Sequence, residues 1–296
     1  MAAAFAQRGY KLAGFDAKVK STVLPGSGLS SSAAFEVLIG RILNGLFANG
    51  EVSAIEIAQI GQYAENVYYG KPSGLMDQMA SSVGGLVFID FNDPKMPVVE
   101  KVDYDFAHSG YTLCTIDAGA DHADLTDEYA AIPREMRAVA EALGGKVLRD
   151  VKVEQLLERL PEVRQKTSDR AVLRALHYYD ENERVRAMYT ALENGDLDAF
   201  LDNVIRSGES SWKLLQNLYV GGSTEQSLAL ACALSERMLR GSGAWRVHGG
   251  GFAGTTLAFV PHYKLAAYVE KMNAVFGAGA CTVLDIRPVG AKKVEL

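Results

Sequence analysis

The sequence predicts an α+β fold organised in two domains, and three observations support this prediction. The chain has 296 residues, of which 48% are hydrophobic, so it can bury a large core and is long enough for more than one domain. Apolar residues recur at helical spacing through its middle part, and short apolar runs typical of strands precede and follow that part. This order of helices and strands indicates two α+β layers.

The first ninety residues predict strands and helices in alternation. The predicted elements are a strand over residues 15–24, a helix over 32–48, a helix over 53–70, a short helix over 74–85 and a strand over 86–91. Ser53 and Glu56 stand three residues apart, as in a capping box, and mark the start of the second helix. Asp77 falls early in the third helix.

A polar segment that contains proline, residues 92–108, marks the domain change. We therefore expect one domain over residues 1–105 and a second over residues 106–296. The second domain begins with a nearly continuous apolar strand, which we expect to lie centrally in its sheet. Its predicted elements are strands over residues 111–117, 256–260 and 281–286, a mainly helical region over 125–239 and a helix over 263–276.

Composition excludes several classes of protein. The formal net charge is −6 and no Lys/Arg cluster stands out, so no nucleic-acid partner is expected. No apolar run reaches the ~20 residues of a membrane span, and the first residues lack a signal peptide's pattern, so neither a membrane partner nor export is expected. Three separated cysteines predict reduced core thiols in a cytoplasmic protein. We expect a monomer or a weak homo-oligomer.

A glycine- and serine-rich turn leads directly into the first long helix. Glycines allow close backbone approach, serines add hydroxyl donors, and the helix N-terminus carries partial positive charge, so this turn is a candidate phosphate cradle. It matches neither the Walker pattern nor the dinucleotide fingerprint. An ordinary capped helix is the alternative interpretation. The candidate residues are Pro25, Gly26, Ser27, Gly28, Leu29, Ser30, Ser31 and Ser32.

Two acidic residues and a second glycine loop add the other parts that phosphoryl transfer from a nucleotide needs. Glu65 is a candidate oxygen ligand for magnesium, and Asp77 is a candidate to orient or deprotonate an acceptor hydroxyl. The alternatives are a solvated helix face for Glu65 and a charge favoured by the helix dipole for Asp77. The loop at residues 249–254 has the alternative of a tight packing turn.

These segments together resemble the GHMP small-molecule kinases. Residues 25–34 look like the nucleotide motif of that superfamily, and residues 249–254 are similar to its third motif. Residues 64–66, 70–78 and 126–129 resemble the galactokinase branch in particular. The matching pieces occur in the family's order and cover nearly the whole chain.

The resemblance implies a two-domain GHMP kinase fold, with an N-terminal part like ribosomal protein S5 domain 2 and a ferredoxin-like C-terminal part. It implies an enzyme that transfers the γ-phosphate of ATP to the C1 hydroxyl of galactose or a related hexose, with Mg²⁺. By resemblance, the glycine and serine run binds ATP, Ser32 and Glu65 bind the metal, and Asp77 is the catalytic carboxylate. The implied substrate-binding residues are Ser73, Gly74, Asp77, Tyr129 and Gly250.

Two departures from the galactokinase pattern matter. The family's paired arginines after the central tyrosine are reduced to Arg134 after Tyr129. The family's N-terminal sugar-binding segment is absent, so we expect an N-terminally truncated chain that could be inactive as it stands. A paralogue without sugar binding and a partner chain that supplies the segment are alternatives. A non-catalytic sensor that binds nucleotide or sugar is the alternative function.

Overall fold

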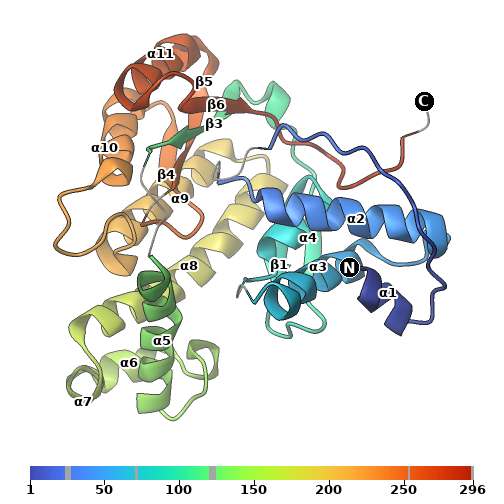
Figure 1. The fold of residues 1–296 in the computed structure, drawn as a ribbon. Coiled ribbons are helices and arrows are strands. Elements are labelled where there is room, and N and C mark those ends of the chain that lie inside the picture. Colours follow the sequence, from blue (N-terminus) through green and yellow to red (C-terminus); the bar gives the residue numbers. More distant parts are fainter. Residues whose placement is uncertain (24–27, 71–72, 120–124, 253, 295–296) are drawn as a thin grey trace. The chain divides into compact units, whose positions relative to one another are not determined.

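The structure is a computed structural model that describes residues 1–23, 28–70, 73–119, 125–252 and 254–294. The chain divides into two units, one formed by residues 1–104 with 286–296 and the other by residues 105–285 (Figure 1). The mixture of helices and strands confirms the α+β prediction. No helix among the described residues is long and apolar enough to cross a membrane.

The C-terminal tail belongs to the first unit, whereas the sequence analysis assigned it to the second domain. The Gly85 amide donates to the Arg287 carbonyl over 2.8 Å. A Cβ on Gly84, whose φ is +70°, would lie 2.1 Å from the Gly290 nitrogen, so the two backbones touch directly. Only glycine permits two backbones to approach so closely. The sequence shows the two glycines but does not show which segment packs against them.

The first unit is mainly helical. Its helices are α1 (Ala2–Gln7), α2 (Ser31–Phe47), α3 (Ala54–Tyr63), the single π-helical turn η1 (Ala64–Tyr68) and α4 (Met76–Val83). The capping box that the sequence predicts at Ser53 and Glu56 is present and begins α3. Buried Phe5, Val37 and Ile57 belong to one apolar cluster that joins α1, α2 and α3.

The first unit's sheet has two antiparallel strands, β1 (Leu86–Asp90) and β2 (Val98–Val102), in which Leu86 pairs with Val102. The sequence analysis missed β2 because it lies in the segment taken for a polar connection. The strand predicted over residues 15–24 is wrong for the part of it that the structure describes. Residues 15–22 are exposed and pair with no strand within the described chain, so weak alternation alone does not make a strand there.

The second unit contains a four-stranded antiparallel sheet. Its strands are β3 (Tyr111–Asp117), β4 (Ala244–His248), β5 (Thr255–Pro261) and β6 (Cys281–Leu284), in the spatial order β4-β5-β3-β6. The interior position of β3 confirms the prediction from its apolar run. With helices α10 (Ser227–Leu239) and α11 (Leu265–Phe276), the chain order is β-α-β-β-α-β, which is the ferredoxin-like arrangement that the resemblance implies.

A helical region is inserted between β3 and α10. Its helices are α5 (Thr126–Ala142), α6 (Val153–Glu158), α7 (Leu160–Lys166), α8 (Asp169–Glu193), α9 (Leu197–Ser210) and the π-helical turn η4 (Ser211–Leu215); short 3₁₀ turns at Phe106–His108, Leu148–Asp150 and His262–Lys264 complete the unit. Val139, Leu156 and Ala175 are fully buried in its own apolar cluster. The helical prediction for residues 125–239 is confirmed.

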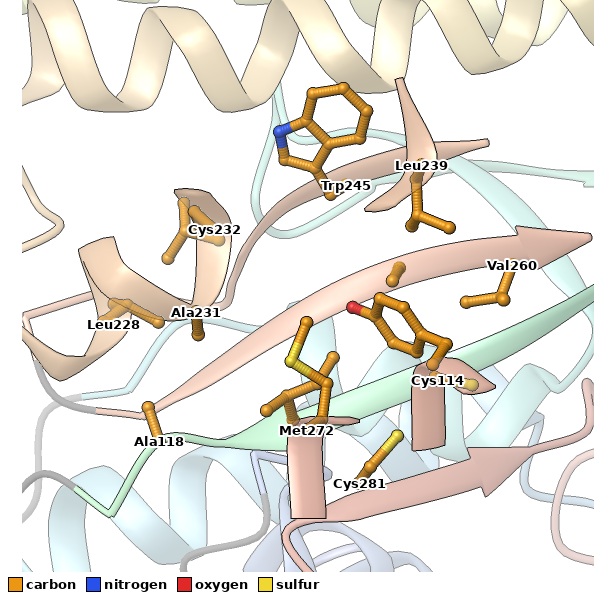
Figure 2. Packing of buried hydrophobic residues seen from close by; sticks show 14 of the residues in the cluster. Cys114, Ala118, Leu228, Ala231, Cys232, Leu239, Trp245, Val260, Met272 and Cys281 are labelled. Carbon is orange, nitrogen blue, oxygen red and sulfur yellow. The ribbon is translucent and has the colours of Figure 1, made fainter. Parts of the chain in front are cut away.

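The main apolar cluster of the second unit lies between the sheet and helices α10 and α11 (Figure 2). Tyr268 and Met272 of α11 are fully buried in it. Cys114, Cys232 and Cys281 are free, buried and part of the same cluster, which confirms the prediction of core thiols. Burial raises the pKa of the Cys232 thiol to about 11.

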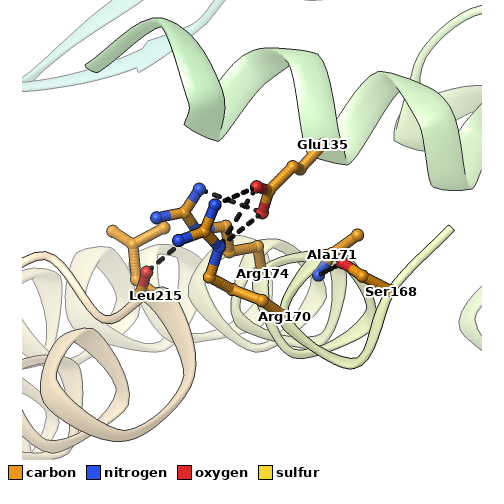
Figure 3. A network of polar contacts seen from close by, with 6 residues as sticks. All are labelled: Glu135, Ser168, Arg170, Ala171, Arg174 and Leu215. Carbon is orange, nitrogen blue, oxygen red and sulfur yellow. Dashed lines mark hydrogen bonds and ion pairs between the residues drawn. The ribbon is translucent and has the colours of Figure 1, made fainter. Parts of the chain in front are cut away.

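A charge network around the buried Arg174 joins three of the inserted helical elements (Figure 3). Glu135 of α5 accepts from Arg170 and Arg174 of α8, with 3.0 Å between Arg174 Nη1 and Glu135 Oε2. Arg174 Nε donates to the Leu215 carbonyl of η4 over 3.1 Å. The Arg174 guanidinium thus binds both the Glu135 carboxylate and the Leu215 carbonyl, and it fixes the C-terminal end of η4.

Candidate active site

The N-terminus of α2 has the features of an anion site. Gly28 (φ +73°) and Ser30 (φ +53°) both adopt the left-handed conformation, and Ser30 is the N-cap residue. Within the described residues the Ser30 side chain makes no capping bond, and the first turn of α2 carries no acidic residue. The amides at this end and the hydroxyls of Ser31 and Ser32 can therefore serve an anion. Pro25, Gly26 and Ser27 of the predicted ATP loop lie outside the described residues.

Glu65 lies next to Ser32, as a shared metal site requires. Glu65 stands in the π-helical turn η1, a rare conformation that is frequent at functional sites. Ser32 Oγ donates to Glu65 Oε1 over 3.1 Å, and the carboxylate is only 4% exposed. Adjacent oxygen ligands around an octahedral Mg²⁺ ion with ~2.1 Å bonds are separated by about 3 Å, so this pair fits two neighbouring positions.

Among the described residues there is no group of three or more His, Cys, Asp or Glu side chains arranged to hold a metal ion. A site with one carboxylate and one hydroxyl suits Mg²⁺ bound together with nucleotide phosphates, because this ion retains water and phosphate ligands.

Helix α4 presents Asp77 and Gln78 in different directions. Asp77 is exposed in the first turn, where the helix dipole favours a carboxylate. Gln78 is buried and its Nε2 donates to Glu65 Oε2 over 2.9 Å. The structure therefore brings α4 against the candidate metal ligand through Gln78, which the sequence analysis did not select.

Ser73, which the resemblance predicts to bind substrate, is held by two side chains that sequence reasoning missed. Its amide and hydroxyl donate to Asn66 Oδ1 over 2.7 and 3.1 Å. Its carbonyl accepts from Asn66 Nδ2 at 3.2 Å and from Gln62 Nε2 at 3.1 Å. Asn66 lies in the motif at residues 64–66, and this motif was the available sequence signal for it. Gly74, which follows, is exposed with open space around it.

The second unit brings Tyr129 of α5 against the late glycine loop. The Tyr129 hydroxyl donates to the Gly251 carbonyl over 2.7 Å, and its ring meets Phe252 edge-on at 5.4 Å between centroids. A Cβ on Gly250 would lie 2.8 Å from Tyr129 Cε1. Tyr129 and Gly250, both predicted to contact substrate, are therefore packed together.

Asn217 holds the same loop from its other side. Its Nδ2 donates to the Gly250 carbonyl over 2.9 Å, and its own carbonyl accepts from the Phe252 amide. A Cβ on Gly251 (φ +80°) would lie 2.1 Å from that Asn217 carbonyl. Asn217 is almost fully buried. It follows η4 and lies 33 residues before Gly250, so no sequence signal near the loop identifies it as a contact.

Comparison with known proteins places this arrangement in a family. Residues 1–85 match the model of the GHMP kinases N terminal domain. The chain is 33% identical to a galactokinase of Streptomyces coelicolor over 278 residues, which cover 93% of this chain and 68% of that protein. The chain belongs to the galactokinase family. A galactokinase of Glaesserella parasuis is 34% identical over 260 residues, which cover 86% of this chain and 63% of that galactokinase.

Solved structures share the fold. The crystal structure of Lactococcus lactis galactokinase complexed with galactose has a TM-score of 0.74 at 22% identity, with 92% of this chain and 69% of that chain covered. The L. major mevalonate kinase in complex with R-mevalonate has a TM-score of 0.59 at 17% identity, with 91% and 69% covered. These likenesses confirm the GHMP kinase fold. The chain spans 63 to 68% of the length of the two galactokinase relatives.

Proposed function

We propose that this member of the galactokinase family is an ATP-dependent sugar kinase that transfers the γ-phosphate to the C1 hydroxyl of galactose or a related hexose. The observation that carries the proposal is the pairing of Ser32 Oγ with Glu65 Oε1 at 3.1 Å, beside an N-terminus of α2 at which the Ser30 side chain makes no capping bond within the described residues. A phosphate-binding helix end adjacent to an oxygen pair of magnesium spacing suits a nucleotide that carries its metal.

The described residues then divide the work. The amides and hydroxyls at residues 28–32 bind phosphate, and Ser32 with Glu65 would hold Mg²⁺. When bound, this ion neutralises charge on the phosphates. Asp77, exposed on α4, accepts the proton of the sugar hydroxyl or orients that hydroxyl. Ser73 and Gly74 are the proposed sugar-binding residues of the first unit, and Tyr129 and Gly250 are those of the second, each pair within its own unit. We further propose a reducing compartment such as the cytoplasm, which three buried free thiols support.

A coupled assay of ADP release with Mg-ATP and a panel of hexoses tests the proposal. We expect turnover that depends on galactose or a closely related hexose. The variant Asp77→Asn should lower kcat by roughly 10²- to 10⁴-fold, because a general base contributes about this much, and should retain ADP binding. Asp16→Asn, another exposed aspartate of the first unit, is the matched control.

Two results would contradict the proposal. Full activity of Asp77→Asn would remove Asp77 from the catalytic role. Intact binding of nucleotide or galactose without turnover on any hexose would instead favour the non-catalytic sensor.

A further inference from the structure

A buried chain of polar side chains extends from Ser32 of α2 through Glu65 to α4 and back to α2. Glu65 Oε1 accepts from Ser32 Oγ, and Glu65 Oε2 accepts from Gln78 Nε2 at 2.9 Å. The same Gln78 Nε2 also donates to Glu36 Oε2 over 3.2 Å. Gln78 is 1% exposed, Glu65 4% and Glu36 7%, so these three side chains are removed from solvent, whereas Ser32 is half-buried. One amide nitrogen thus bridges two buried carboxylates.

The two carboxylates fix which way the Gln78 amide faces. An amide rotated by half a turn would direct Oε1 at both carboxylates, where it would be repelled, so only the observed orientation donates to them. In this orientation Gln78 Oε1 is buried and, within the part of the chain that the structure describes, has no hydrogen-bond partner. A buried acceptor without a hydrogen-bond partner lowers the stability of the fold, and proteins retain such unpaired groups mainly at functional sites.

Helix α3 packs closely against the side chains of Glu36 and Gln78. Gly61 of α3 faces this group, and a Cβ there would lie 3.2 Å from Glu36 Oε2 and 3.3 Å from Gln78 Cγ. Glycine at position 61 therefore lets α3 approach closely enough to confine both side chains. Gln78 also follows Asp77 directly, and neighbours on a helix point about 100° apart, so one turn of α4 directs Asp77 outward and Gln78 inward.

We propose that Gln78 is a positioning residue for the metal site, and that Glu36 acts through Gln78 to hold its amide in the donating orientation. Gln78 binds Glu65 Oε2, which leaves Oε1 directed at Ser32, the second candidate ligand. Side chains that orient metal ligands in this way change metal affinity by about 10- to 100-fold when they are removed. This inference rests on the proposed function, because it takes Ser32 and Glu65 as the magnesium ligands.

Binding of Mn²⁺ in the presence of ADP tests the proposal without turnover. The paramagnetic resonance signal of free Mn²⁺ gives the dissociation constant of the ion, which stands in for Mg²⁺. Gln78→Met keeps the size of the side chain and removes its donor. We expect Mn²⁺ to bind at least tenfold more weakly to this variant, with ADP affinity in the absence of metal unchanged. Gln59→Met is the matched control. Gln59 Nε2, on α3, donates a hydrogen bond to the Lys95 carbonyl over 2.9 Å, which lies outside this chain of contacts.

A double-mutant cycle tests the role of Glu36. Glu36→Gln removes the charge that orients the amide, so Mn²⁺ should bind about threefold or more weakly, but the change should add nothing in the Gln78→Met background. An equal loss in both backgrounds would overturn the statement that Glu36 acts through Gln78. If Gln78→Met does not fold, the test uses Glu36→Gln, provided that the unfolding midpoint of this variant is unchanged. An Mn²⁺ affinity of Glu36→Gln equal to that of the unmutated protein would then overturn the proposal.

The failure of this inference differs from a failure of the proposed function. Unchanged Mn²⁺ affinity in Gln78→Met, together with hexose-dependent turnover by the unmutated protein, overturns only the positioning role. A weakened Mn²⁺ site in Gln78→Met, in a protein that phosphorylates no hexose, supports the positioning role and overturns only the kinase reaction. Absence of Mn²⁺ binding by the unmutated protein with ADP overturns the positioning role.

Discussion

His177 should make the stability of the second unit depend on pH. The side chain lies on α8 and is 8% exposed, with its Nδ1 2.9 Å from Ser210 Oγ of α9. Burial, together with the nearby positive charges of Arg184 and Arg246, lowers the pKa of His177 to about 4. In the unfolded chain the imidazole has its ordinary pKa, near 6.5.

The sign and size of the effect follow from proton linkage. Because the unfolded state binds a proton more readily, His177 has no effect above pH 6.5, and stability is lost as the pH falls from 6.5 towards 4. The two pKa values differ by about 2.5 units, so the full loss is about 3.4 kcal/mol, of which about 2 kcal/mol is already lost at pH 5. This is a substantial share of the stability of an ordinary domain.

The variant His177→Asn removes the titrating ring but keeps a polar group near the position of Nδ1. Its free energy of unfolding should fall by about 2 kcal/mol less than that of the unmutated protein between pH 7.5 and pH 5. Urea unfolding followed by tryptophan fluorescence measures this, because both tryptophans, Trp212 and Trp245, lie in the second unit. His262→Asn, at an exposed position of the same unit, is the control. An identical pH dependence in His177→Asn and the unmutated protein would refute the reasoning.

Two further predictions concern local structure. Gly250→Ala should displace the Tyr129 ring, since the new Cβ would lie 2.8 Å from Cε1, and should raise KM for the sugar several-fold while Mn²⁺ binding with ADP stays unchanged; an unaltered KM would separate the loop from sugar binding. Asn44→Ala should destabilise the first unit by about 1–3 kcal/mol for each partner left unpaired, because Asn44 binds the Val52 carbonyl at 2.7 Å and amide at 3.0 Å in a buried position. Hydrogen exchange at the Val52 amide measures the second effect, and unchanged protection there would contradict it.

Local signals in the sequence predicted the elements whose causes are local. The capping box at Ser53 and Glu56 gives the start of α3, and the apolar run at 111–117 gives an interior strand. The predicted strand was wrong over the described residues 15–22, and β4 was missed, because strand formation depends on a partner strand that can lie anywhere in the chain. The pairing of β4 with β5 is a tertiary fact that its own five residues do not encode.

The residues of the candidate site also fall into those that a local motif identifies and those that only the folded structure identifies. Ser32, Glu65 and Asp77 stand in motifs and could be selected from the sequence. Gln78 stands in the motif at residues 70–78, but the sequence predicts no role for it. Its side chain binds two carboxylates, 13 and 42 residues away in the sequence, that only folding brings to it. Asn217 has no motif at all, and its contact with Gly250 spans 33 residues.

The return of the last residues to the first unit has a consequence for the order in which the protein can be completed. Residues 105–285 form an uninterrupted stretch, so the ferredoxin-like unit can finish folding as soon as it has been synthesised. The first unit contains the candidate metal ligands, yet its backbone contacts at Gly84 and Gly85 wait for residues 287–290, which are synthesised after residues 105–285. A stop codon shortly after position 285 would therefore damage the unit that holds the candidate metal ligands, although residues 1–104 of that unit would still be present.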